Sequence, residues 1–292
     1  MTDPEGARAI RRILVALDAS PDSLAALEAA GELASRLDAE LAGLFVEDVR
    51  LVQAAALSLA RAVNVPSATE REFDVEAIER ELRVQAARIR RELSAIGERL
   101  QVRWTLRVAR GQVAAEVIDA AREADLLLMG RGGRPSVRDV RLGSVAHSAA
   151  TESTAPVLLL RAGTRITAPV LVGYDGSPAS RRALALAAAL ARAESGGLTV
   201  LVEGATGEAA RRLEEDVVAR IGGAGVQTRF RRVPPGDGRL LREAVIREGA
   251  GMLVLGGRRD ETELQDLARW LAELDQPVLI LGSGPVKSRS HA

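Results

Sequence analysis

The chain has 292 residues, about twice the ~150 residues of a usual domain, and its 47% hydrophobic and 27% charged side chains are typical of a globular protein. Forty basic residues balance forty acidic ones, which leaves no positive field of the kind that non-specific binding to nucleic acid or anionic membranes needs. The absence of cysteine excludes thiolate chemistry, the single lysine Lys287 excludes a P-loop lysine, and two histidines are too few for a multi-histidine metal site.

No targeting segment is evident, and the longest run of small apolar residues, 183–191, is much shorter than the ~20 residues that span a bilayer. We therefore expect a cytoplasmic protein with no membrane insertion and no nucleic-acid partner.

Short Leu- and Val-rich runs alternate with helical patterns, which is typical of a parallel sheet joined by crossover helices. The first helix begins at Ser20-Pro21, a hydroxyl cap followed by proline. In the first half of the chain we place strands at 12–17, 41–46, 102–109, 125–130 and 156–161, and helices at 21–37, 70–100, 112–123 and 143–152.

Two segments leave alternatives open. Apolar residues between Val75 and Leu100 recur at spacings of three, four and seven, which predicts one apolar stripe on a long helix. We favour a crossover helix packed on the sheet, with a partner-binding helix as the alternative. The apolar stretch Leu51 to Ala62 is either a loop or a short helix over the ligand site.

The sequence repeats itself. Arg12-Ile-Leu-Val-Ala-Leu-Asp18-Ala-Ser-Pro21 aligns with Pro169-Val-Leu-Val-Gly-Tyr-Asp175-Gly-Ser-Pro178. Two later segments, 123–130 and 155–160, match 249–256 and 276–281 in the same order. The second copy is 36 residues shorter, mostly because it lacks the long segment between the second and third strands.

We therefore predict an α/β protein made of two tandem doubly wound domains, each with a five-stranded parallel sheet. The expected boundaries are 1–161 for the first domain, 162–168 for a linker, 169–283 for the second domain and 284–292 for a tail. The two Pro-Val strands, at 156 and 277, are expected to pair edge to edge and form a pseudo-dimer within one chain.

Glycines give the most specific signal. Gly130-Arg-Gly-Gly133 follows an apolar strand, and after nine intervening residues Gly143-Ser144 opens a helical pattern, so the motif is G-x2-G-x9-G-S. Glycines allow phosphates to approach main-chain amides, and a helix start presents free N–H groups and the positive end of its dipole. The motif predicts a site for a polyphosphate. His147, one turn into this helix, is either close to that phosphate or, as we favour, a surface or interface residue.

The chain resembles the universal stress protein family, in particular the subgroup that binds ATP. The resemblance rests on the first-strand aspartates Asp18 and Asp175, on this glycine motif and on the Pro-Val strands at 156 and 277. The resemblance implies nucleotide at the carboxyl ends of the strands, where open α/β sheets generally bind ligands. By similarity, Ala16, Leu17, Asp18 and Val46 would hold the adenosine part, Met129, Gly130, Gly132 and Gly133 would line the ribose and phosphate side, and Gly143, Ser144, Val145 and Ala146 would hold the phosphates.

The sequence departs from the family pattern at three places. Gly132 stands where His or Arg is common and Ala146 where a hydroxyl residue is common, and each lost hydrogen bond to a charged group costs ~1.5–3 kcal/mol. In the second copy, Gly256-Gly-Arg-Arg259 is followed by Asp260, Glu261, Glu263 and Asp266, which would repel a polyphosphate. We expect weakened binding in the first copy and none in the second.

The resemblance implies a stress-response protein that binds ATP, with or without Mg2+, or a related adenine nucleotide, and acts through nucleotide-dependent contact with a protein partner of unknown identity. The alternatives are an interaction module that binds no nucleotide and a slow ATPase. We identify no catalytic residues and no metal ligands, and further homodimerisation is an open alternative.

Overall fold

The computed structural model describes residues 10–56, 61–64, 69–72, 75–132, 143–194, 196–204, 206–223, 225–233, 238–256 and 274–282. In chain order, the elements of the first half are β1 (Arg12–Leu17), α1 (Pro21–Leu37), β2 (Glu40–Asp48), α2 (Val49–Ala56), β3 (Arg61–Asn64), β4 (Thr69–Glu72), α3 (Val75–Leu100), β5 (Trp104–Gly111), α4 (Val113–Ala121), β6 (Leu126–Gly130), α5 (Ser144–Glu152) and β7 (Val157–Leu160). Those of the second half are β8 (Val170–Tyr174), α6 (Pro178–Ala193), β9 (Leu198–Glu203), α7 (Gly207–Ile221), β10 (Thr228–Val233), α8 (Gly238–Arg247), β11 (Met252–Gly256) and β12 (Val278–Leu281).

Ten of the described strands form one continuous sheet. Its order is β10-β9-β8-β11-β12-β7-β6-β1-β2-β5, so each half contributes five parallel strands in the same relative order. The halves meet where β12 pairs with β7 in antiparallel register, with Leu279 opposite Leu158. The α/β fold is confirmed, and the two Pro-Val strands pair as expected.

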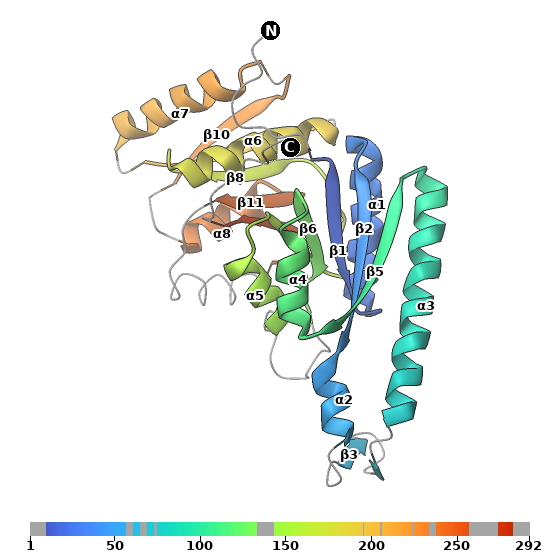
Figure 1. Ribbon diagram of the computed structural model, residues 1–292. Coiled ribbons are helices and arrows are strands. Elements are labelled where there is room, and N and C mark those ends of the chain that lie inside the picture. The colour runs from blue at the N-terminus through green and yellow to red at the C-terminus, as the bar shows by residue number, and fades with distance from the viewer. Residues whose placement is uncertain are drawn as a thin grey trace, which may run out of the picture.

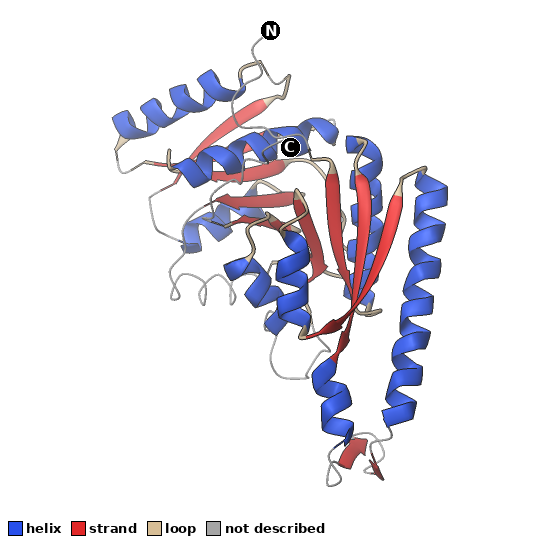
Figure 2. Ribbon diagram, viewed as in Figure 1, coloured by secondary structure: helices blue, strands red, loops and turns tan. Residues whose placement is uncertain are grey.

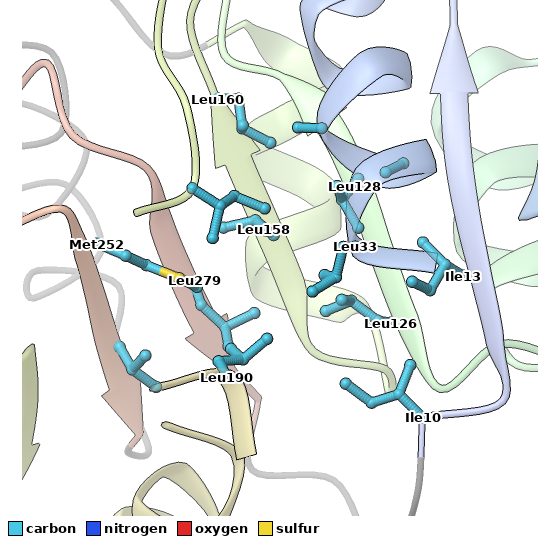
Figure 3. Close-up of a cluster of buried hydrophobic side chains, with 14 of the residues drawn as sticks. Ile10, Ile13, Leu33, Leu126, Leu128, Leu158, Leu160, Leu190, Met252 and Leu279 are labelled. Atoms are coloured by element: carbon cyan, nitrogen blue, oxygen red, sulfur yellow. The ribbon is translucent and has the colours of Figure 1, made fainter. Parts of the chain in front are cut away.

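Helices cover both faces of this sheet (Figures 1 and 2). One core cluster lies beneath α1, α3, α6 and α7, and the other lies beneath α4, α5 and α8. The first cluster continues across the junction of the halves, where Leu158 of β7, Leu279 of β12 and Leu190 of α6 lie together (Figure 3). The apolar strands are therefore buried on both sides, which is why their sequence runs lack alternation.

The same device starts the first helix of each half. The Ser20 hydroxyl accepts a hydrogen bond from the Ser23 amide at 3.2 Å, and Pro21 occupies the first turn of α1. In the second half, the Ser177 hydroxyl accepts from Ser180 at 3.1 Å at the start of α6. The cap places the amino terminus of each helix directly beyond the strand that precedes it.

The segment between β2 and β5 differs from expectation. The long helix was expected from residue 70, but α3 begins at Val75, and residues 69–72 instead form β4, which pairs antiparallel with β3. The polar run Thr69–Glu72 has no apolar periodicity, so its pairing with 61–64 determines its conformation. Most of α3 packs as the expected crossover helix, with Ile89 and Leu93 fully buried against the core.

Candidate functional site

A pocket of about 180 Å³ lies at the carboxyl ends of β1, β2 and β6, beside the start of α5. Its lining includes eleven of the twelve residues expected from the sequence: Ala16, Leu17, Asp18, Val46, Met129, Gly130, Gly132, Gly143, Ser144, Val145 and Ala146. The twelfth, Gly133, lies outside the described residues. Residues as far apart as 16 and 146 therefore converge because the parallel strands β1 and β6 are neighbours and end at one edge.

Other lining residues were not anticipated. Leu44, Val113 and Val117 belong to the apolar part of the lining, and Ser20, Ser23 and Arg131 also contribute. Val113 and Val117 come from α4, whose start follows β5 at the same sheet edge. The order of the elements was a signal for this helix, because a helix that follows an expected strand begins near the carboxyl edge of the sheet.

The turn after β1 presents a carboxylate to the pocket. Asp18 is exposed, and its Oδ1 accepts a hydrogen bond from the Ser20 amide at 2.9 Å, while its own amide donates to the Ser23 hydroxyl at 3.3 Å. These contacts orient the carboxyl group, and Oδ2 makes no hydrogen bond to the described residues. That oxygen can accept from a donor on a ligand.

Gly130, the last residue of β6, and Gly132 allow the first turn of α1 to approach closely. A Cβ at Gly130 would lie 2.7 Å from Asp22 Cβ and 2.9 Å from the Asp22 carbonyl carbon. The Gly132 amide donates to Asp22 Oδ2 at 3.0 Å, and the Ala162 amide donates to Asp22 Oδ1 at 2.8 Å. Asp22 thus joins the loops after β6 and β7, and the Gly132 amide already has a protein acceptor.

The amino terminus of α5 supplies the polar end of the pocket. Gly143 is the N-cap, with no side-chain cap, and its amide donates to the Arg131 carbonyl at 3.0 Å. Because an α-helix leaves its first amides without intrahelical acceptors, the N–H groups of Ser144, Val145 and Ala146 can bind an anionic ligand. His147 follows them but does not line the pocket.

One segment expected near the site is described only in part. The stretch 51–62 was expected as a loop or a short helix over the site. Its first part is helical, as α2, residues 57–60 lie outside the described residues, and the described side chains of α2 are not among those that line the pocket. Among the described residues, no group of three or more His, Cys, Asp and Glu is arranged to hold a metal ion.

The second half repeats the turn but changes its surroundings. The Asp175 carboxylate accepts from the Ser177 amide at 2.8 Å, as Asp18 does from Ser20. Burial raises the pKa of Asp175, but hydrogen bonds from Ser180 and Ser177 outweigh it, so the pKa is lowered overall. Tyr174 replaces Leu17, and its hydroxyl donates to Asp216 of α7. The acidic segment 260–266, expected to repel phosphate, lies outside the described residues.

The fold and the pocket together define an open, doubly wound α/β protein with a ligand-sized pocket at the carboxyl edge of its parallel strands. Comparison with known proteins then gives the family. The model of the universal stress protein family matches residues 9–161, and the chain belongs to this family.

Known relatives agree with this assignment. The universal stress protein YxiE of Bacillus subtilis is 32% identical over 152 residues, which cover 51% of this chain and 98% of YxiE. A universal stress protein of Mycobacterium tuberculosis is 32% identical over 107 residues, 35% of this chain, but the match spans only 33% of its own length.

The likeness to solved structures concerns the fold. The crystal structure of a universal stress protein from Archaeoglobus fulgidus superposes with a TM-score of 0.72 at 20% identity, over 94% of this chain and 98% of that one. A Pseudomonas aeruginosa structure described as a putative universal stress protein gives a TM-score of 0.59 at 17% identity, over 94% of each chain. Within the described residues, no helix has the length and apolar character needed to cross a membrane.

Proposed function

We propose that the first half of this protein binds ATP, or a related adenine nucleotide, in the pocket between β1, β6 and α5. The observation that carries the proposal is the convergence of the turn aspartate, the glycine loop and a helix amino terminus on one pocket. Apolar side chains suit a planar base, and the helix amides suit an anionic tail.

Each part of the pocket takes one part of the nucleotide. The free oxygen of Asp18 accepts from the exocyclic amine of adenine, while Val46, Met129 and Val113 contact its ring. The amides of Ser144, Val145 and Ala146 bind phosphate oxygens. Asp18 carries the only carboxylate among the described lining residues, and no acidic cluster is present in the described part of the chain. A Mg2+ ion would therefore be carried mainly by the phosphates.

Binding without fast turnover is the function that this pocket supports. Its described lining contains no histidine or glutamate that would serve as a base. We infer a cytoplasmic stress-response protein whose nucleotide state alters contact with a protein partner. A slow ATPase and an interaction module without nucleotide are the alternatives.

We also propose that the chain divides into units at 1–161 and 169–283, joined by 162–168. The identical strand order of the two halves supports this division. In this arrangement, the second unit is a structural partner that binds no nucleotide.

Calorimetric titration with ATP-Mg tests the proposal, with Asp18→Ala and Asp175→Ala as a matched pair. Both aspartates accept from a serine amide two residues later, so both variants lose the same local support. We expect one site per chain, with affinity lowered about 2- to 10-fold by Asp18→Ala, the value of about one hydrogen bond, and unchanged by Asp175→Ala.

Other results would contradict parts of the proposal. Two sites per chain would show that the second half binds nucleotide. No heat and no thermal shift at millimolar ATP would instead favour the interaction module. A phosphate-release assay on the same samples separates binding from slow hydrolysis.

A further inference from the structure

Arg131 lies between Gly130 and Gly132, and we call this segment, residues 130–132, the pocket loop. The side chain of Arg131 extends to the second half of the protein. It lines the pocket and is buried, with only 4% of its surface exposed. Its guanidinium donates to the carbonyl of Leu274 at 2.5 Å and to the carbonyl of Gln276. Both carbonyls lie just before β12, so one side chain connects the pocket loop to the second half.

The main chain of Arg131 connects the pocket loop to two elements of the first half. Its amide donates to the Leu160 carbonyl at 2.8 Å, at the end of β7. Its carbonyl accepts from Gly143, the N-cap of α5, at 3.0 Å. Arg131 thus helps to fix the start of α5, whose first residues line the pocket.

The charge of Arg131 depends on this arrangement. Burial and the nearby Arg161 lower its pKa to about 10, while Asp275 and Asp22 act in the opposite direction. The side chain therefore stays cationic at neutral pH although it is removed from water. A buried cation is tolerated only where acceptors surround it, and here the second half supplies two carbonyls and Asp275.

We propose that Arg131 is a positioning residue that couples the phosphate-binding end of the pocket to docking of the second half. For its effect on ligand affinity, the proposal rests on the nucleotide-binding function inferred above. The second half then contributes to binding although it has no ligand site, because it holds the pocket loop, and this loop positions the amides of α5 that would bind phosphate. Linkage requires the converse effect, in which a bound anion tightens contact between the halves.

The first test needs no nucleotide. Hydrogen exchange of the full chain is compared among wild type, Arg131→Met and the control Arg161→Met. Arg161 pairs with Asp275 at 3.2 Å across the same junction but does not line the pocket. We expect Arg131→Met to speed exchange both at 143–152 and at 274–282, and Arg161→Met to affect 274–282 alone. Unchanged exchange at 143–152 in Arg131→Met, or equal loosening there in both variants, would overturn the coupling.

The second test separates positioning from general destabilisation. We expect Arg131→Met to weaken ATP binding about 5- to 150-fold, the usual range of coupling between sites, and to leave adenosine binding unchanged. Equal losses for ATP and adenosine would indicate a merely structural role and overturn the proposal. If wild type binds neither ligand, the nucleotide function fails, and the exchange data alone decide whether Arg131 couples the two halves.

Discussion

A negative charge at the start of α5 is expected to separate ligand binding from stability. Ser144 is exposed at the first position of this helix, where an acidic side chain interacts favourably with the helix dipole. Ser144→Asp should therefore leave the protein equally stable or stabilise it by about 0.3–1 kcal/mol. The same carboxylate would lie beside a phosphate bound to the neighbouring amides and repel it.

The size of that repulsion follows from Coulomb's law. For unit charges about 5 Å apart, the cost is about 0.8 kcal/mol with the dielectric constant of water and about 3 kcal/mol with an effective value of 20. ATP affinity should therefore fall by about 4- to 150-fold, with a smaller effect at high salt. Adenosine, which has no phosphate, should bind as it does to wild type.

The assay is calorimetric titration of both ligands together with thermal unfolding, and Thr151→Asp is the control. Thr151 lies on the same helix about 10 Å further along, beyond the ~8 Å Debye length at physiological salt. Unchanged ATP affinity in Ser144→Asp would refute the placement of phosphate at this helix terminus. Equal loss of adenosine binding would show that the charge acts by disturbing the fold.

Three further predictions concern stability. Gly130→Ala brings a Cβ within 2.7 Å of Asp22 Cβ and should cost about 1–3 kcal/mol in denaturant unfolding, so unaltered stability would show that α1 can shift freely. Leu93→Ala removes a fully buried side chain and should lower the free energy of unfolding by about 2–5 kcal/mol. Val84→Ala, on the same helix at a site 55% exposed, should lower it by less than about 0.5 kcal/mol. Similar losses in the two variants would contradict the packing of α3. The hydrogen bond from Arg220 lowers the pKa of Asp216, so the ionised carboxylate stabilises the fold above its usual pKa, and this effect is lost as pH falls through the lowered value. In Asp216→Asn, the free energy of unfolding should therefore depend less on pH below about pH 4. An unchanged pH dependence would contradict this role.

Sequence alone predicted the parts of the fold that depend on local pattern. The first strand and the first helix were predicted at the residues observed, because continuous burial and a Ser-Pro cap leave clear signals at their ends. The hairpin of β3 and β4 was missed, since its short polar strands carry no apolar alternation and form only by pairing with each other. The start of α3 was misplaced for the same reason.

Site residues could be predicted where the sheet topology determines their position. They could not be predicted where long-range tertiary contacts determine it. Asp18, Gly130 and Ser144 follow strands or open helices at one sheet edge, so the order of elements brings them together. The roles of Asp22 and Arg131 depend on partners more than a hundred residues away in the chain. No local spacing signals such contacts.

The antiparallel joint of β7 with β12 has a consequence for how such a protein evolves and responds to dilution. Because both partners of the joint belong to one polypeptide, their association is unimolecular and is not lost at low protein concentration. A symmetric homodimer must use one surface against itself, whereas here each face can accumulate its own substitutions. One unit is thereby free to lose ligand recognition and specialise as a permanent support for the other.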